Sequence, residues 1–365
     1  MNIIHLQLSG GPGGIVSLCR DMNKHSAHHN FFYFLFEGGS IADEIAAQGG
    51  TVQVATGAKG HPLKAAADLV RYCKEQQIDV VVDHSGSPYT RFVHIYAARR
   101  LKKVRFLLYL HANAYYGADK GIKEWVYARL LRSAARHSAG IVAISHSVAE
   151  SYLRRYRLPK DKMQVVYNGT DLHRFIPHPA HTDTPLRLIY VGRIFKDKGI
   201  DLLLEALAAC PADAPITLTL VGSDHGGYTE QMQALTARLH LEDKVRFLGS
   251  RTDVPQLLQT ADLFVHPATC EEGFGITLIE AMASGVPCLA FPKGAIPEII
   301  GPEIDGFLTE EVSATALTAG INRALDLFTK APHHWRTLCK NARQKAELFS
   351  IERTVAQLEA LYQEQ

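Results

Sequence analysis

The chain has 365 residues, of which 47% are hydrophobic and 21% are charged, and its formal net charge at pH 7 is +2. This length favours two domains of ordinary size over one large domain. The composition excludes a disordered chain, because a disordered chain carries more charge and fewer apolar residues. No apolar run reaches the roughly 18 residues that a membrane-spanning helix needs. Residues 1–6 lack the features of a secretory signal and predict a first β-strand.

Cysteine usage points to a reducing compartment. The six cysteines are scattered, and no two of them form a C-x-x-C pair. This pattern argues against a disulfide framework and against a structural zinc site. We therefore expect a cytoplasmic protein with reduced thiols.

The small net charge hides an asymmetry between the two halves. Residues 1–175 hold 23 Lys+Arg and 13 Asp+Glu, whereas the remainder holds 16 and 24. The basic excess is concentrated at residues 99–105, 120–136 and 154–157. The middle stretch interleaves basic residues with Trp125 and Tyr127, as do helices that lie on anionic membranes. This predicts peripheral association with the inner face of the cytoplasmic membrane. A solvated helix face is the alternative, and nucleic acid is not expected because no binding motif accompanies the charge.

Both halves alternate short apolar strands with helical stretches, which is the pattern of parallel α/β sheets. Strands are expected at residues 3–8, 31–36, 80–83, 105–111, 140–145 and 164–167, and then at 186–191, 216–221, 245–248, 263–266 and 286–291. Residues 177–185 are rich in proline and polar residues and predict a linker.

This order predicts an α/β fold of two Rossmann-like, doubly wound parallel-sheet domains that face a central cleft. The first domain is expected at residues 1–176 and the second at 186–348. The last helix, at about 349–365, is expected to pack back on the first domain. Ligands of such sheets bind at the carboxyl ends of the strands.

A glycine-rich loop follows the first expected strand and precedes a helix. Gly11, Gly13 and Gly14 let the backbone approach a ligand closely, and the helix start adds positive potential. The spacing differs from that of a dinucleotide-binding loop, and no acidic residue follows near residue 30, so a dehydrogenase is not expected. We expect the loop to contact phosphate or an acceptor. A simple tight turn is the alternative.

Two histidines come directly after expected strands in the first half. His84 follows residues 80–83, and His111 follows residues 105–110. At the carboxyl end of a strand each can hydrogen-bond a ligand, and His84 is expected to do so together with the acceptor or phosphate loop. A structural role is the alternative. The other histidines show no metal-ligand spacing and the chain holds no Asp-x-Asp pair, so metal independence is expected.

The second half carries four charged residues in two motifs. Arg193 and Lys198 follow the strand at 186–191, and two cations there suit a diphosphate. Glu272 and Glu280 flank a Gly-Phe-Gly turn that opens a helical stretch. The start of that helix suits an anion, and carboxylates suit paired hydroxyl groups. A loop acid with an unrelated surface glutamate is the alternative.

These motifs resemble those of glycosyltransferase family 4, the retaining group 1 glycosyltransferases of the GT-B fold. The likeness rests on V-G-R-x-x-x-x-K-G at residues 191–199, on the two glutamates spaced as E-x7-E from Glu272, and on E-A-M-A-x-G at 280–285. Similar segments lie at 168–175, 246–249, 261–267 and 294–306. The likeness covers nearly the whole second half and is looser over the first.

The resemblance implies roles for these residues. Glu280 would hold the ribose diol, and Glu272 would contact hydroxyls of the donor sugar. Arg193 and Lys198 would bind the diphosphate and stabilise the charge that develops on it. His111 would contact the donor sugar. The donor site would be completed by Gly192, Arg251, Gly273, Phe274, Gly275, Ile276, Thr277, Ala295 and Ile296. No metal or other cofactor is implied, since the nucleotide sugar is a substrate.

The expected function is therefore retaining transfer of a hexose-type sugar from a UDP-sugar to a glycan or lipid-linked acceptor. Bacterial surface polysaccharide or lipopolysaccharide assembly is the expected pathway. No general base is evident, which suits a front-face mechanism in which the leaving phosphate takes the acceptor proton. Two alternatives stay open: a nucleotide-sugar epimerase of the same fold, and a non-catalytic subunit that binds sugar nucleotides.

Overall fold

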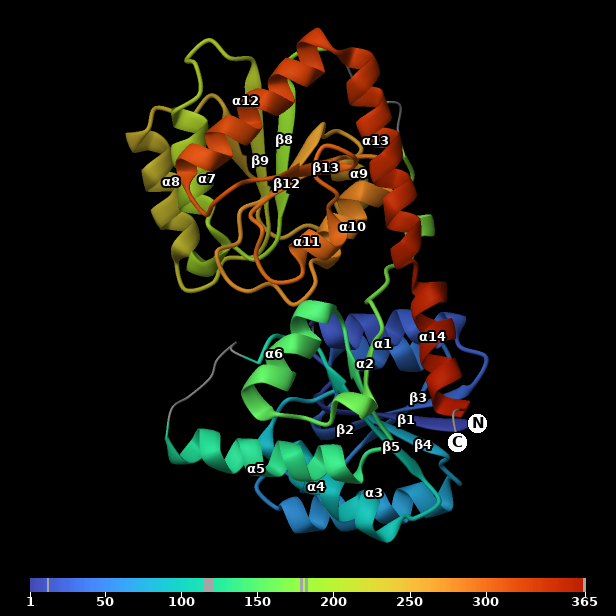
Figure 1. Cartoon of the computed structure of the whole chain (residues 1–365). Helices are drawn as coiled ribbons and strands as arrows, with labels where there is room; N and C mark the ends of the chain where they lie inside the picture. The colour runs from blue at the N-terminus through green and yellow to red at the C-terminus, as the bar shows by residue number, and fades with distance from the viewer. Residues whose placement is uncertain (12, 115–120, 178–179, 181–182, 364–365) are drawn as a thin grey trace. The chain divides into compact units, whose positions relative to one another are not determined.

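The computed structural model describes residues 1–11, 13–114, 121–177, 180 and 183–363 (Figure 1). These residues form two compact units, one comprising Met1–Gly169 and Ile351–Gln365 and the other Thr170–Ser350. Each unit is built on one sheet, and all of its strand pairs are parallel. The expected class of two Rossmann-like, doubly wound domains is confirmed.

The sheet of the first unit has the strand order β3-β2-β1-β4-β5-β6-β7. Its strands are β1 (Asn2–Ser9), β2 (His29–Glu37), β3 (Thr51–Val54), β4 (Val80–Asp83), β5 (Arg105–Leu110), β6 (Gly140–Ala143) and β7 (Met163–Val165). Its helices are α1 (Gly14–His25), α2 (Ser40–Ala47), α3 (Pro62–Glu75), α4 (Pro88–Arg100), α5 (Ile122–His137), α6 (His146–Tyr156) and α14 (Ile351–Gln363).

The sheet of the second unit has the order β10-β9-β8-β11-β12-β13. Its strands are β8 (Leu186–Val191), β9 (Ile216–Val221), β10 (Val245–Phe247), β11 (Leu263–His266), β12 (Cys288–Ala290) and β13 (Gly306–Leu308). Its helices are α7 (Ile200–Ala208), α8 (Tyr228–Arg238), α9 (Val254–Leu258), α10 (Ile276–Ala283), α11 (Ile296–Ile299), α12 (Ala314–Lys330) and α13 (Pro332–Ala346).

Successive residues of β1 and β2 face opposite sides of the first sheet. Ile4 and Leu6 belong to the core that includes residues of α3 and α4. Phe32 and Phe34 belong to a second core with residues of α1 and α2. Helices therefore cover both faces of the sheet (Figure 1), as the alternation of apolar strands and helices requires.

The last helix, α14, is part of the first unit. Its residues Val355, Leu358 and Leu361 are buried, and the helix packs against α1. The Glu359 carboxylate accepts hydrogen bonds from the Ser26 hydroxyl at 2.8 Å and from the Ala27 amide at 2.9 Å.

The second unit begins earlier in the chain than the sequence predicted. The Thr170 amide donates to the Phe349 carbonyl at 3.1 Å, and Thr170 bridges Ser350. The chain passes from the first unit to the second after Gly169 and returns after Ser350. These two points of the chain therefore lie side by side. Of the expected linker, residues 178–179 and 181–182 lie outside the described residues, as do Pro12 and Lys120.

Candidate functional site

The strand ends of the second unit gather a charged cluster around Glu272. The Glu272 carboxylate lies 2.9 Å from the Lys198 ammonium and 3.5 Å from Nε2 of His266. Lys198 ends a 3₁₀ turn, Lys196–Lys198, beyond β8, and His266 is the last residue of β11. Because β8 and β11 are neighbours in a parallel sheet, their carboxyl ends bring these side chains together.

Both members of the ion pair are charged at neutral pH. Burial alone would raise the pKa of Glu272, but the contacts with His266 and Lys198 outweigh it and lower that pKa to about 2. Burial alone would lower the pKa of Lys198, but the Glu272 charge outweighs it and raises that pKa. The site therefore holds a carboxylate and an ammonium that neutralise each other.

Two glycines allow the loops of this cluster to touch. Gly199 has φ +64°, and a Cβ there would lie 2.0 Å from the Pro267 carbonyl oxygen. Gly294 has φ +59°, and a Cβ there would lie 2.1 Å from the Glu272 carbonyl oxygen. No side chain fits at either distance, so glycine is required where the backbone segments meet. These contacts fix the loop that carries Glu272.

The Gly-Phe-Gly turn leads into α10. The first amides of a helix have no acceptor within the helix, so the start of α10, at Ile276 and Thr277, can donate to an anion. Glu280 lies in the same helix and is half-buried, as are Gly273 and Gly275. Phe274 is buried and meets the Phe349 ring edge-on, with ring centroids 5.7 Å apart.

The amides of Ala295 and Ile296 form hydrogen bonds within the protein. The Ala295 amide donates to the Glu272 carbonyl at 2.9 Å and so helps to hold the Glu272 loop in place. The Ile296 amide donates to the Lys293 carbonyl at 3.2 Å.

The remaining predicted donor-site residues are placed differently from one another. The Gly192 amide donates to the Val221 carbonyl, and the exposed Arg193 follows it at the end of β8. Burial raises the pKa of Tyr190, and the Glu272 charge raises it further, whereas the Arg193 charge lowers it. Arg193 and Glu272 therefore both act on the Tyr190 hydroxyl.

Arg251 is exposed and forms a bidentate pair with Asp253, at 2.8 and 2.6 Å. The structure therefore does not join Arg251 to the Glu272 cluster.

The glycine-rich loop of the first unit is open along one side. A Cβ at Gly11, Gly13 or Gly14 would meet no atom within 4 Å. Gly13 caps the start of α1, and the Gly10 carbonyl accepts two amides from the start of α2. The loop is thus anchored at Gly10 and leaves backbone accessible at the three predicted positions.

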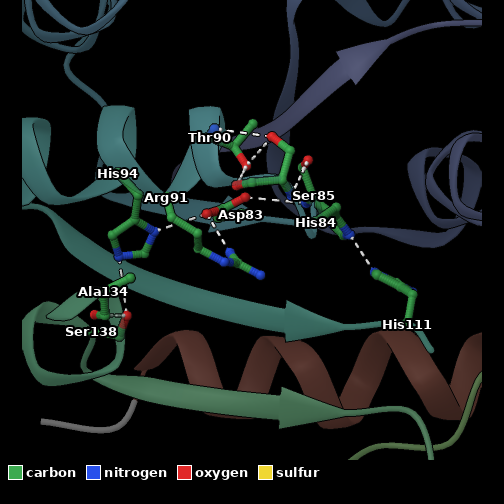
Figure 2. Close-up of polar contacts among 10 residues, drawn as sticks. Asp83, His84, Ser85, Thr90, Arg91, His94, His111, Ala134 and Ser138 are labelled. Atoms are coloured by element: carbon green, nitrogen blue, oxygen red, sulfur yellow. Dashed lines mark hydrogen bonds and ion pairs between the residues drawn. The ribbon is translucent and has the colours of Figure 1, made fainter. Parts of the chain in front are cut away.

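The two predicted histidines of the first unit are in direct contact (Figure 2). Nδ1 of His84 lies 2.9 Å from Nε2 of His111. His84 is buried and His111 is partly exposed. Burial is the main cause that lowers the pKa of His111, to about 3, and it lowers that of His84 as well. Both imidazoles are therefore neutral at pH 7.

Sequence reasoning missed a buried polar network beside these histidines. Asp83 and Arg91 are fully buried, with Arg91 Nη1 2.5 Å from Asp83 Oδ2, and His94 Nδ1 lies 3.2 Å from the same oxygen (Figure 2). The signal was present in the sequence, because Asp83 closes an otherwise apolar strand and Arg91 and His94 are one helical turn apart. His266 could have been recognised in the same way as Asp83, because it is a polar residue that ends the apolar strand β11.

Two further properties concern metals and membranes. His5, Cys19 and His84 each offer a ligand atom, and the three atoms lie within 4.8 Å of one another. In the part of the chain that the structure describes, no helix has the length and apolar character to cross a bilayer.

Comparison with known proteins places both units. The profile "Glycosyl transferases group 1" matches residues 174–345, and the profile "Glycosyltransferase Family 4" matches residues 13–174.

Two relatives and one solved structure illustrate the likeness. The chain is 27% identical to N-acetyl-alpha-D-glucosaminyl L-malate synthase of Bacillus anthracis, over 83% of this chain and 79% of that one. It is 28% identical to the lipopolysaccharide core biosynthesis mannosyltransferase LpsB of Rhizobium meliloti, over 54% of this chain and 60% of that one. The structure of Anabaena Alr3699/HepE in complex with UDP superimposes with a TM-score of 0.84 at 24% identity, covering 99% of each chain.

These findings agree with the motifs that suggested the family. One profile covers the unit that carries Glu272 and Lys198, and the other covers the unit that carries His84 and His111. The structural likeness shows that the two sheets are those of the GT-B fold. The chain belongs to the group 1 glycosyltransferases of family 4.

Proposed function

We propose that this glycosyltransferase moves a hexose-type sugar from a UDP-sugar to a glycan or lipid-linked acceptor, with retention of anomeric configuration. The observation that carries the proposal is the Lys198–Glu272 pair at the ends of β8 and β11. An ammonium near the start of α10 suits a diphosphate, and a carboxylate suits the hydroxyls of the attached sugar.

The chemistry follows from where charge develops. Breaking the bond between sugar and diphosphate leaves positive charge on the sugar ring and sends the bonding electrons to the phosphate oxygen. Lys198, Arg193 and the first amides of α10 would stabilise that oxygen. Glu280 would hold the ribose. The acceptor hydroxyl would then bond to the sugar carbon and give its proton to the leaving phosphate.

The comparisons support the donor class and the pathway. The Anabaena structure holds UDP, and the Rhizobium relative is named for lipopolysaccharide core biosynthesis. By analogy we propose a UDP-sugar donor and a role in surface polysaccharide or lipopolysaccharide assembly. In the first unit we assign donor-sugar contact to His111 and acceptor or phosphate contact to the glycine-rich loop. The proposed chemistry uses no metal or other cofactor.

Thermal stability with nucleotides tests the donor site. UDP at a hundred times its dissociation constant should stabilise the protein by about 2.7 kcal/mol, whereas GDP, ADP and TDP should not. Lys198→Ala should abolish the effect. Lys196→Ala is the matched control, because Lys196 is exposed on the same 3₁₀ turn. A UDP effect that survives in Lys198→Ala would contradict the assignment of the diphosphate site.

Product analysis separates the alternatives. A transferase converts a UDP-sugar to UDP only when an acceptor is present, apart from slow hydrolysis. An epimerase would change the sugar while it stays attached to UDP, without any acceptor. A binding subunit would give the thermal shift and no product at all.

We also propose that α5 lies on an anionic membrane surface. Ile122 and Trp125 are 82% and 60% exposed. Arg129, whose guanidinium lies 4.9 Å from the centre of the Trp125 ring, and Arg136 follow on the same exposed stripe. A stripe that combines exposed apolar and basic residues is typical of helices bound at membrane interfaces.

Vesicle sedimentation tests this surface. Changing Arg129 and Arg136 to Glu should abolish sedimentation with phosphatidylglycerol vesicles. Changing the exposed Lys64 and Lys74 of α3 to Glu alters the net charge equally and should have little effect. Equal loss of sedimentation in both double variants would show that net charge alone attracts the protein to the vesicles. Unchanged sedimentation in both would contradict the proposal.

A further inference from the structure

A continuous row of hydrogen bonds crosses the first sheet. Asn30 Oδ1 lies 3.2 Å from His5 Nε2, His5 Nδ1 lies 2.9 Å from His84 Nε2, and His84 Nδ1 lies 2.9 Å from His111 Nε2. Asn30 is on β2 and His5 on β1, while His84 and His111 follow β4 and β5. These are four neighbouring strands. We call these four residues the histidine row.

The inner members of the row are buried. Asn30, His5 and His84 are 5%, 1% and 2% exposed. The His5 ring stacks on Phe32 at a centroid distance of 5.1 Å, and the Cys19 thiol lies 3.8 Å from His84 Nε2. Burial lowers the pKa of His5 to about 4 and that of His84 well below its ordinary value. Each imidazole is therefore neutral at pH 7, with one N–H and one lone pair.

The amide of Asn30 fixes the direction of the row. Its Nδ2 donates to the His28 carbonyl, so Oδ1 is the atom that faces His5. An amide oxygen only accepts, and His5 must therefore carry its proton on Nε2. The lone pair on His5 Nδ1 then requires a donor, which is the Nε2–H of His84. By the same step His84 Nδ1 accepts from the Nε2–H of His111.

We infer that Asn30, His5 and His84 are positioning residues that hold His111 as its Nε2–H tautomer, so that His111 presents Nδ1 as a hydrogen-bond acceptor. The inference deepens the proposed function, in which His111 contacts the donor sugar. A neutral acceptor selects a hydroxyl, which can donate. It does not bind a phosphate oxygen, which can only accept.

A metal ion at His5, Cys19 and His84 would impose the opposite arrangement. It would take the lone pairs of His5 Nδ1 and His84 Nε2, so His84 would donate from Nδ1 to His111 Nε2. His111 would then carry its proton on Nδ1. The observed contacts favour the row: the two ring nitrogens are at hydrogen-bond distance, Gln7 Nε2 donates to Cys19 Sγ at 3.2 Å, and burial raises the pKa of the Cys19 thiol.

Nitrogen-15 NMR of the histidine rings in the full-length, ligand-free protein at pH 7 tests the inference directly. His5, His84 and His111 should each carry their proton on Nε2, with the signals assigned from single substitutions. His111 with its proton on Nδ1 would overturn the inference. So would one equivalent of bound zinc, detected by elemental analysis of the purified protein.

Two substitutions at His84 add a readout that a merely structural role would not move. His84→Leu removes the acceptor for His111, which should become a mixture of both tautomers. His84→Gln restores an acceptor and should return His111 to Nε2–H. If the leucine variant fails to fold, the spectra of the wild-type protein and of the glutamine variant still show whether His111 carries its proton on Nε2. An Nε2–H His111 in both variants would overturn the role of His84.

The outcome is independent of the proposed function. The NMR experiment needs no nucleotide, whereas the proposed function fails if UDP does not stabilise the protein. If His111 carries its proton on Nε2 but UDP does not stabilise the protein, the inference about the histidine row stands and the proposed donor is refuted. If His111 carries its proton on Nδ1 and the protein binds UDP, the inference is refuted and the proposed donor stands.

Discussion

Glu272 and Glu280 are expected to divide the work of donor binding. Lys198 is neutralised by Glu272 in the ligand-free protein, so Glu272→Gln leaves a full positive charge for the diphosphate. We expect this variant to bind UDP at least as tightly as the wild type and to lose turnover of the UDP-sugar donor. Glu280→Gln should weaken UDP binding about tenfold or more, because a hydrogen bond to a charged group contributes about 1.5–3 kcal/mol.

Calorimetric titration with UDP and initial rates with the UDP-sugar donor measure the two effects separately. Wild-type turnover in Glu272→Gln, or equal loss of UDP affinity in both variants, would contradict the division of roles.

The buried pair of Asp83 and Arg91 should contribute more to the free energy of unfolding of the first unit than the exposed pair of Arg71 and Asp68 does. Arg91→Met leaves Asp83 buried without its main counter-charge, and the expected cost is about 3–5 kcal/mol. Arg71→Met removes the exposed pair between Arg71 and Asp68 and should cost less than about 1 kcal/mol. Denaturant unfolding of both variants measures the difference. Similar costs would show that burial of the pair is unimportant.

The sequence marked candidate site residues at strand ends and at a helix start. His84, His111 and Lys198 were predicted because each comes after an apolar strand, and Glu272 because it precedes a Gly-Phe-Gly turn that opens a helical stretch. His5 was missed because it lies inside a strand and acquires its role from Asn30 on β2 and His84 after β4. The hydrogen-bond partners of the Ala295 and Ile296 amides could not be predicted, because the partner of a backbone amide is set by loop packing, which residue types do not reveal.

At the scale of elements, the loop before α10 depends on Gly294. Gly294→Ala places a Cβ against the Glu272 carbonyl and should displace the Glu272 loop, with loss of turnover of the UDP-sugar donor. Gly226→Ala is the matched control, since Gly226 also has positive φ, +74°, but a Cβ there meets nothing within 4 Å. The control should cost about 1–2 kcal/mol of backbone strain and leave turnover intact. Comparable loss of turnover in both would show that strain, and not the clash, is responsible.

Most strands were predictable from their apolar residues. β1, β2 and β4 to β12 were found near their observed bounds, and the short β4 and β11 match them at both ends. β3 was not found, because all four of its residues are only half-buried at the edge of the sheet. β13 was also missed; it begins at a glycine, which is not typical of strands.

At the scale of the whole molecule, the two units should respond differently to acid. Burial lowers the pKa of His5, His84, His94 and His111 in the first unit below the ordinary value of 6.5. The unfolded chain therefore binds protons first, and stability is lost as the pH falls below about 6.5 toward the folded pKa values. In the second unit the lowered pKa of Glu272 contributes stability that is present above 4.5 and is lost only as the pH falls toward 2.

Hydrogen exchange at pH 7 and pH 5, corrected for intrinsic rates, measures this. Amides of the first unit should lose protection at pH 5 while those of the second retain theirs. Earlier loss in the second unit would refute the assignment of acid sensitivity to the buried histidines.

The placement of α14 has a consequence for synthesis on the ribosome. The core against α1 is closed by residues from Ile351 onward, which emerge only after all of Thr170–Ser350 has been made. At roughly 5–20 residues per second this delay lasts on the order of ten to thirty seconds. During that time the nascent first unit exposes the apolar surface of α1 that α14 later covers. The part of the protein that is translated first is therefore the part that finishes folding last.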